Sequence, residues 1–446
     1  MKKFTKRKII LIVLLFMGLI FTIYPVSATS CRIFKRTLRA GAYVLPITPM
    51  TDDNGVPINP DGSPVFLAGF GDPGDRPAQV IHDDIYARCL ILDYYRTTIV
   101  FVALDLIGYF IDQVDMVRNK VEDEFGIDAD NVIIACTHTH SGPDTLGLWT
   151  PPYPIPGVNW PYMEYVASQI VECIGQAYQN LEKAKIRFAS MSVPGLMKNS
   201  RDEGRVYPDL EVMNVVGRRG DTIATMINYA GHPEVLWSNN LELTSDYVGY
   251  LRDKVEEELG GIAIFFNGAL GGMITPDVEE HTFEKAKEIG YALAYATISA
   301  LRSRKCWGSF FPSWKKTFNL EKQTFEVPLE NPQFYGAILY GMLYRPEPWY
   351  VDSPGMGILM SEVNVINIGA AQIITMPGEV LPSIGYRLKE AMTGKYNFQI
   401  GLGNDELGYI IPEDEWDPSQ YEESMSVGMQ TGIVMEAILM EMLEGT

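Results

Sequence analysis

The sequence predicts an α/β fold, a mixed multi-layer arrangement in which central β-sheets are flanked by helices. Short β-branched runs alternate with amphipathic helical stretches along the chain, which is typical of α/β proteins. Several of the strand-like runs end in histidine, glycine or an acidic residue. Ligands of α/β sheets bind beyond the carboxyl ends of strands, so we expect the functional site at these C-terminal strand ends.

The elements are expected in alternating order from residue 97 onward. Strands are predicted at residues 97–106, 132–136, 222–229, 262–266 and 370–375, and helices at residues 163–181, 247–259, 283–301 and 381–392. No low-complexity linker, composition break or internal repeat is evident. We therefore expect one catalytic domain over residues 29–446.

Two segments rich in aromatic residues interrupt this alternation, at residues 149–162 and 306–350. Ligand pockets are lined mostly by aromatic and aliphatic side chains. Because the first segment directly follows a strand that ends in histidines, we expect it to form an apolar rim for an acyl-chain substrate. We expect the second to be an ordinary packed surface excursion.

The N-terminal residues 1–28 are predicted to be a signal peptide. A positive region (Lys2, Lys3, Lys6, Arg7, Lys8) precedes an apolar run over residues 9–23 and a small-residue cleavage site at Val26-Ser27-Ala28. The apolar run is shorter than the roughly 20 residues of a membrane-spanning helix. We expect an exported protein, secreted or held in the cell envelope, with an uncleaved signal anchor as the alternative.

Charge and cysteine content exclude several protein classes. The net charge is −20, from 36 basic and 56 acidic residues, whereas a nucleic-acid binder needs a basic footprint. The same charge argues against simple electrostatic adhesion to anionic lipid, which leaves only transient contact with a membrane surface. The five cysteines are scattered and form no disulfide framework. The oligomeric state is not predicted.

The stretch NVIIACTHTHSGPD at residues 131–144 carries the strongest chemical signal. An apolar run leads to His138 and His140, and two of the chain's five histidines therefore lie at one strand end. Side chains two apart on a strand point to the same side, so we expect both imidazoles to face one site.

Other strand ends bring His232 and Glu379, together with a glycine turn at Gly271-Gly272 whose N–H groups could approach a substrate. Two histidines and one carboxylate with an open position are typical of catalytic zinc. Taken singly, His232 could be a turn histidine and Glu379 a helix cap.

Together these segments resemble the neutral (non-lysosomal) ceramidase family, zinc-dependent amidases that cleave ceramide into sphingosine and a fatty acid. The stretch THTHSGP at residues 137–143 is the most specific element. The other family-like segments lie before and after it, in the same order along the chain as in the family. They are residues 41–49 (GAYVLPITP), Asn199-Ser200-Arg201, Gly231-His232, residues 272–277, Gly378-Glu379, Gly408-Tyr409 and Tyr421-Glu422.

The resemblance implies a role for each matching residue. His138 and His232 resemble zinc ligands, Glu379 the carboxylate ligand, and Tyr409 a phenol at the edge of the metal. His140 resembles the acid/base or substrate-orienting histidine. Arg201 and Tyr421 resemble groups that hold the scissile carbonyl, and Thr275 is expected to support the developing charge. The implied protein is an exported zinc-dependent amidohydrolase that acts on ceramide or a related N-acyl lipid.

The chain departs from the family pattern at a few positions. The glycine turn reads Gly-Met-Ile-Thr-Pro-Asp where the family has Gly-Asp-Val-Ser-Pro-Asn, so Thr275 stands in place of a serine. Asp144 stands where the family usually has glycine. Full-length ceramidases add a carboxyl-terminal immunoglobulin-like domain, and this chain is expected to correspond to the catalytic domain without it.

Two other functions compete with this hypothesis. A serine esterase would use Ser141 with His138 or His140, although Ser141 lies outside a Gly-x-Ser-x-Gly elbow. A non-catalytic envelope protein that binds lipid or glycan would keep the fold and lose the chemistry, as the changes at Met273 and Thr275 would allow.

Overall fold

The computed structural model describes residues 37–151, 157–303, 318–339, 343, 350–353 and 356–445. The predicted signal peptide, Cys31, Cys306 and part of the aromatic segment at residues 306–350 lie outside the described residues. Among the helices of the described part, none is long and apolar enough to cross a bilayer.

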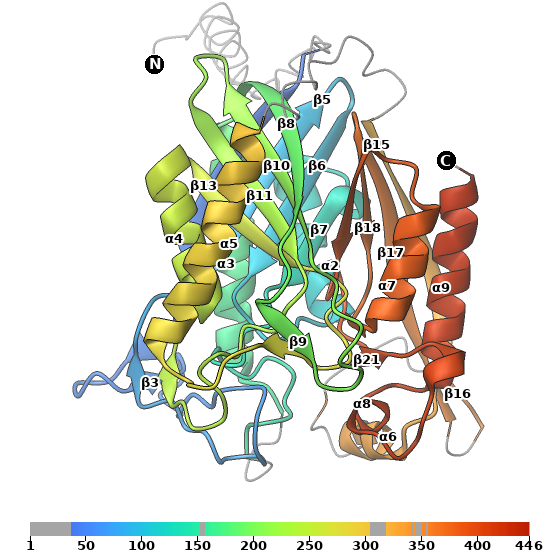
Figure 1. Cartoon of the computed structure of the whole chain (residues 1–446). Helices are drawn as coiled ribbons and strands as arrows, with labels where there is room; N and C mark the ends of the chain where they lie inside the picture. Colours follow the sequence, from blue (N-terminus) through green and yellow to red (C-terminus); the bar gives the residue numbers. More distant parts are fainter. Residues whose placement is uncertain are drawn as a thin grey trace, which may run out of the picture. The chain divides into compact units, whose positions relative to one another are not determined.

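The larger β-sheet has eight strands and forms the centre of the fold (Figure 1). Its spatial order is β13 (Ile262–Asn267), β11 (Thr222–Tyr229), β10 (Asp209–Gly217), β8 (Glu182–Ser192), β1 (Arg39–Pro46), β5 (Tyr86–Tyr94), β6 (Thr97–Leu104) and β7 (Val132–Cys136). The runs predicted at residues 132–136 and 222–229 are strands with those bounds.

This sheet consists of two halves with the same topology. In the order β1-β5-β6-β7 the successive pairs are antiparallel, antiparallel and parallel, and the order β8-β10-β11-β13 repeats that pattern. Each half places a helix before its last strand and another after it. The halves join where Arg39 and Ala40 pair with Lys183 and Glu182. The fold thus contains an internal repeat that the sequence did not reveal.

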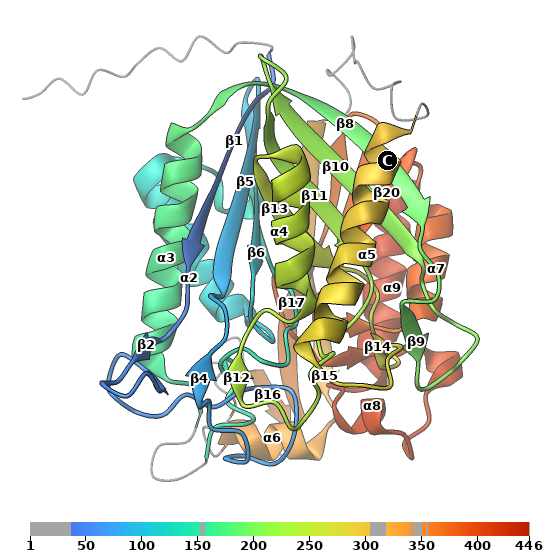
Figure 2. The ribbon, with the colours of Figure 1, turned by 60° about the vertical axis from the view of Figure 1, so that its left-hand side comes forward.

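Helices cover one face of this sheet, as Figure 2 shows. They are α2 (Ile111–Phe125), α3 (Trp160–Gln179), α4 (Tyr247–Leu259) and α5 (Phe283–Arg302). Buried side chains alternate along β6: Val100 and Val102 pack toward the helices, whereas Ile99 and Phe101 pack toward the other face. Because both faces are covered, the strand is a continuous apolar run.

A second sheet packs on the other face of the large sheet. It contains β15 (Phe318–Leu329), β16 (Tyr350–Ser353), β17 (Met356–Ile368), β18 (Ala371–Thr375) and β20 (Tyr396–Ile400). Its outer face packs against α7 (Pro382–Ala391) and α9 (Met429–Glu444). The resulting helix–sheet–sheet–helix layers confirm the predicted mixed α/β class.

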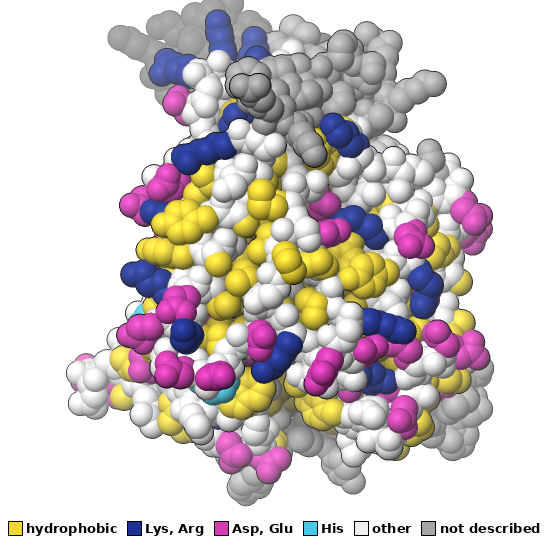
Figure 3. Space-filling model, in the orientation of Figure 1, with side chains coloured by type: hydrophobic (Ala, Val, Ile, Leu, Met, Phe, Trp, Pro, Cys, Tyr) yellow, Lys and Arg dark blue, Asp and Glu magenta, His cyan; other side chains and the backbone are white. Residues whose placement is uncertain are grey.

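Short elements lie near the ends of the main strands. They are the strand pairs β2 (Met50–Thr51) with β3 (Pro57–Ile58), β4 (Val80–Ile81) with β12 (Glu242–Leu243), β9 (Met197–Asn199) with β14 (Ile274–Pro276), and β19 (Glu379–Val380) with β21 (Tyr409–Ile410), and the helices α6 (Pro332–Leu339) and α8 (Tyr421–Ser424). On the face shown in Figure 3, apolar side chains lie across the middle and charged groups of both signs surround them.

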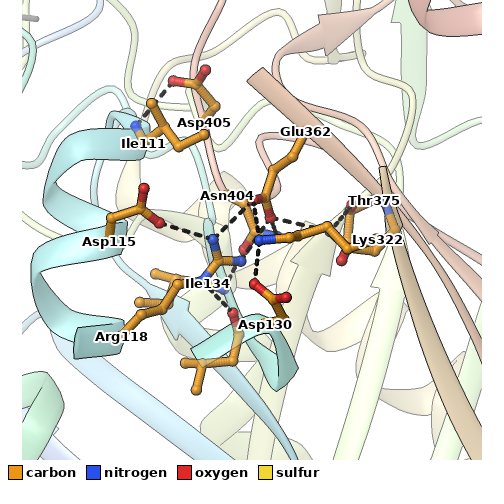
Figure 4. A network of polar contacts seen from close by, with 12 residues as sticks. Ile111, Asp115, Arg118, Asp130, Ile134, Lys322, Glu362, Thr375, Asn404 and Asp405 are labelled. Carbon is orange, nitrogen blue, oxygen red and sulfur yellow. Dashed lines mark hydrogen bonds and ion pairs between the residues drawn. The ribbon is translucent and has the colours of Figure 1, made fainter. Parts of the chain in front are cut away.

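A buried ion pair ties the two sheets together behind the candidate site (Figure 4). The Arg118 guanidinium on α2 donates to both carboxylate oxygens of Glu362 on β17, at 2.7 and 3.0 Å, and to the carbonyl of Val132. Asn404 bonds the same carboxylate and accepts the Ile134 N–H at 2.9 Å. These contacts fix β7, the strand that leads to the histidines, against the second sheet.

Candidate metal centre and active site

Two histidines from different halves of the large sheet present the same nitrogen to the site. His138 follows β7 and its Nδ1 lies 2.6 Å from the Ile107 carbonyl oxygen. His232 follows β11 and its Nδ1 lies 2.9 Å from the Ile274 carbonyl oxygen. A carbonyl can only accept a hydrogen bond, so Nδ1 carries the proton in both rings and Nε2 carries the lone pair.

Both Nε2 atoms face the carboxylate of Glu379, which the turn after β18 delivers to the site. Glu379 Oε2 is 3.0 Å from His232 Nε2, and Oε1 is 3.5 Å from His138 Nε2. Glycine is required before it, because a Cβ on Gly378 would lie 2.5 Å from the Gly408 carbonyl oxygen. Burial alone would raise the pKa of Glu379, but His138 and His232 outweigh it and hold that pKa well below its usual range.

The arrangement of these three side chains fits a divalent metal ion. Lone pairs on two imidazoles and a carboxylate converge, and only a cation or a proton between them removes the repulsion. Metal-binding histidines characteristically donate their other N–H to a carbonyl or carboxylate, as His138 and His232 do here. His138, His140 and His232 each place a possible ligand atom within 4.8 Å of the others, and all three are buried.

The backbone of His138 differs from the expected strand geometry. The strand ends at Cys136, and His138 has φ of 68°, in the left-handed region. A non-glycine residue there costs about 1–3 kcal/mol and is found disproportionately at functional sites. The rings of His138 and His140 do lie together, with centroids 5.0 Å apart, but a turn brings them there rather than strand alternation.

His140 lies beside a buried carboxylate that the sequence analysis did not single out. Its Nδ1 is 3.2 Å from Glu234 Oε2, although the two groups are not oriented as a hydrogen bond. Burial lowers the pKa of His140 well below its usual value, and the neighbouring His138 and His232 lower it further. Burial raises the pKa of Glu234, against the opposing effect of His232.

The predicted hydroxyl-bearing residues lie around this cluster. Thr275 on β14 is buried, and its hydroxyl lowers the pKa of Glu234. Tyr409 pairs with Glu379 between β21 and β19, and its hydroxyl lies 3.1 Å from Met273 Sδ. Burial and the Glu379 charge raise the pKa of the Tyr409 phenol well above its usual value. Tyr421 is 55% exposed at the start of α8, with its ring centroid 6.1 Å from that of Tyr409.

Arg201 occupies a different position from the one its implied role suggests. Its guanidinium donates to the carboxylates of Glu422 and Glu423 and to the Glu415 carbonyl, at 2.6–3.1 Å. Within the described residues none of these partners belongs to the histidine–Glu379 cluster. Arg201 therefore anchors α8, the helix that begins with Tyr421.

Hydrogen bonds bear on two other sequence-based expectations. The Gly271 N–H donates to the Val380 carbonyl at 2.9 Å, so of the two N–H groups of the glycine turn this one is engaged within the protein. The Ser141 hydroxyl accepts from Asn240 at 2.9 Å, and Asn240 is the partner recorded for it among the described residues. Neither His138 nor His140 contacts it there as a catalytic base would.

Sequence reasoning missed two further residues that shape the site. Asn267, at the end of β13, donates to the carbonyls of Thr137 and Gly231 at 2.9 and 3.0 Å and so joins the ends of three strands. Asp144 was noted only as a departure from a pattern. Its carboxylate accepts four backbone N–H groups, from Leu146, Gly147, Trp149 and Thr150, at 2.8–3.0 Å.

An apolar cavity reaches His138 and Glu379. Its wall is formed mainly by aliphatic and aromatic side chains, with Glu406 as a further charged residue. The lining residues are Ile107, Phe110, His138, Leu146, Leu148, Trp149, Leu329, Phe334, Ile338, Leu343, Leu359, Glu379, Glu406, Leu407, Gly408, Met425 and Val427. Trp149 lies in the first aromatic segment as expected, but Phe334 and Leu343 come from the second, which was expected to be a surface excursion.

A family model for the N-terminal part of neutral/alkaline non-lysosomal ceramidases matches residues 62–265 of this chain. This match supports the assignment of the chain to the neutral/alkaline ceramidase family. The matched segment contains His138, His140 and His232.

Solved structures agree with the family in fold. The crystal structure of neutral ceramidase from Pseudomonas aeruginosa superimposes with a TM-score of 0.73 at 16% identity, over 92% of this chain and 74% of that one. A ceramidase complexed with C2 gives a TM-score of 0.72 at 16% identity, over 92% and 75% of the two chains. The family match implies a ceramidase-like hydrolase of amide bonds, and the buried histidines of this chain could bind a metal ion.

Proposed function

We propose that this protein is an exported, zinc-dependent amidohydrolase that cleaves the amide bond of ceramide or a related N-acyl lipid. The single observation that carries the proposal is the cavity, because its apolar wall ends at two of the three candidate metal ligands. A fatty acyl chain in that wall would place its carbonyl carbon beside His138 and Glu379. Burying each methylene there would contribute about 0.8 kcal/mol to binding.

His138, His232 and Glu379 would hold the ion, with the Tyr409 phenol at its edge. A zinc ion in such a site would act as a Lewis acid, which polarises the amide carbonyl and lowers the pKa of water to about 7. The residues of the chain orient the reaction. The carbonyls of Ile107 and Ile274 fix the two imidazoles, so that both Nε2 lone pairs point at one place.

The remaining predicted residues take supporting roles in this proposal. His140 orients the nucleophilic water and transfers its proton to the leaving amine. Tyr421 and Thr275 stabilise charge that develops on the carbonyl oxygen. Arg201 acts indirectly: its ion pairs with Glu422 and Glu423 hold the helix that begins with Tyr421.

Export is supported by the signal-like residues 1–28. Substrate access from a membrane surface would then need only transient contact.

The test is the metal content of the purified mature protein combined with hydrolysis of a fluorescent short-chain ceramide, before and after chelation. We expect about one zinc per chain, chelator-sensitive cleavage and recovery on adding zinc. Glu379→Gln should lose both metal and activity, whereas Ser141→Ala should keep most of both.

Other outcomes would replace the proposal. Bound zinc without cleavage of any acyl amide in a broad panel would favour a lipid-binding protein. Activity that survives chelation but not Ser141→Ala would favour a serine esterase.

A further inference from the structure

Glu234 is a buried carboxylate without a structural hydrogen bond. Its side chain is 0% exposed, and neither of its oxygens meets hydrogen-bond geometry with a described residue, although the Thr275 hydroxyl is near enough to lower its pKa. The other buried carboxylates among the described residues each have a hydrogen-bond partner on at least one oxygen. Asp105 accepts two bonds from Arg252, at 2.7 and 2.8 Å, and Asp246 accepts the N–H groups of Tyr247 and Leu236. Buried polar groups left unpaired call for an explanation, and a catalytic role is one of them.

In space, the carboxylate of Glu234 lies beside the imidazole of His140, whose ring nitrogens also lack hydrogen-bond partners among the described residues. Glu234 Oε2 lies 3.2 Å from His140 Nδ1, and neither ring nitrogen has a hydrogen-bond partner in the described structure. The ring is held in place on its other sides. A Cβ on Gly69 would lie 2.4 Å from His140 Cγ, and the Phe70 ring meets the imidazole edge-on at 4.8 Å. The distance between the two groups is that of a hydrogen bond, and only their relative orientation differs from one.

We propose that Glu234 is a positioning residue that accepts the Nδ1–H of His140 and so fixes the tautomer in which Nε2 is the acceptor. A neutral imidazole carries its proton on either nitrogen, and the partner of one nitrogen decides the state of the other. With the proton on Nε2, the Nδ1 lone pair would face a carboxylate oxygen at 3.2 Å, which is repulsive. The role of His140 as proton acceptor belongs to the proposed function, whereas its tautomer does not depend on it.

The experiment reads the tautomer directly. The zinc-loaded protein is labelled with ¹⁵N-histidine, and long-range ¹H–¹⁵N correlations report the protonated nitrogen of each of the five imidazoles. A His140→Asn variant assigns the relevant signals. We expect His140 to carry its proton on Nδ1 in the unmodified protein.

Two variants then test the carboxylate. Glu234→Met keeps the length of the side chain but removes the acceptor, and should shift the His140 proton to Nε2. Glu234→Gln keeps an acceptor oxygen and should retain the Nδ1 proton. Glu211→Gln, which alters a buried carboxylate on β10 outside the site, is the matched control and should leave the His140 signals unmoved.

Activity provides a second readout. We expect kcat of Glu234→Met to fall about 10- to 100-fold, with KM nearly unchanged and zinc content intact. This is the typical loss when a residue that hydrogen-bonds to a side chain of the site is removed. An Nε2 proton in the unmodified protein, or an unchanged tautomer in Glu234→Met, would overturn the proposal. Loss of zinc from that variant would also overturn it, since Glu234 would then serve the ion. If no amide is hydrolysed at all, the NMR result still decides.

Discussion

Asp144 organises the wall of the apolar cavity, and its removal should be costly. Its Oδ1 accepts the N–H groups of Leu146 and Gly147, and its Oδ2 accepts those of Trp149 and Thr150. The first two bonds are buried and the other two are partly buried. In Asp144→Ala the buried pair would lose its acceptor, whereas water could reach the other pair.

The magnitude follows from these bonds. Each buried group left unsatisfied costs about 1–3 kcal/mol, so Asp144→Ala should lower the free energy of unfolding by about 2–6 kcal/mol. Asp144→Asn keeps one acceptor oxygen and should lose roughly half as much. Because Leu146 and Trp149 line the cavity, the loosened loop should also reduce kcat/KM more for long acyl chains than for short ones.

Urea unfolding of the two variants measures the first effect, and hydrolysis of a chain-length series measures the second. Asp61→Ala is the matched control, because this aspartate also accepts a backbone N–H, from Ser63 at 3.0 Å, but in an exposed loop. It should change stability by no more than about 0.5 kcal/mol. A loss below about 1 kcal/mol in Asp144→Ala would show that the carboxylate does not hold the loop.

Three further predictions concern the ion pair between the sheets and the cavity. Arg118→Met should cost about 3–5 kcal/mol in urea unfolding because it strands a buried charge, and adding Glu362→Leu should recover most of that loss. Equal losses in the single and double variants would contradict this account. Burial raises the pKa of Glu362, but Arg118 outweighs it and holds that pKa below its ordinary 4.5. The unfolded state therefore binds more protons below pH 4.5, and stability should fall there as the pH drops through the folded-state pKa. Thermal unfolding should show a weaker acid dependence in Glu362→Gln, and an unchanged dependence would refute the assignment. Leu146→Trp should fill part of the cavity and lower kcat/KM for long-chain amides, by about fourfold for each methylene excluded, while short-chain turnover is retained. A uniform loss across chain lengths would argue against an acyl site.

The main strands and the candidate metal ligands could be predicted because local sequence indicates them. A short, β-branched apolar run such as residues 132–136 favours a strand buried on both faces, and its end is visible in the polar residues that follow. His138, His232 and Glu379 each stand directly after such a run. Their convergence was predictable from the general position of sites at strand ends, without knowledge of the topology.

The partners of these residues could not be predicted, because they come from distant parts of the chain. Arg201 contacts Glu423 across 222 residues, and nothing near Arg201 in the sequence indicates that pairing. Glu234 was overlooked because an acid two positions after His232 looks like a loop residue until the fold buries it.

The internal repeat was hidden for a related reason. The two halves share strand directions and pairing order, which are properties of hydrogen bonding between strands rather than of side-chain sequence.

The repeat explains why the site lies where it does. Each half ends in a parallel pair whose carboxyl ends are open, and the first half contributes His138 while the second contributes His232. Glu379 comes from the second sheet and completes the set. A metal ion bound by these three residues would therefore connect three parts of the fold, two of which Asn267 also joins near the site. Carbonyl oxygens fix the imidazoles of His138 and His232, and strand pairing with Tyr409 fixes the backbone of Glu379, so the protein itself holds the three candidate ligands in this arrangement.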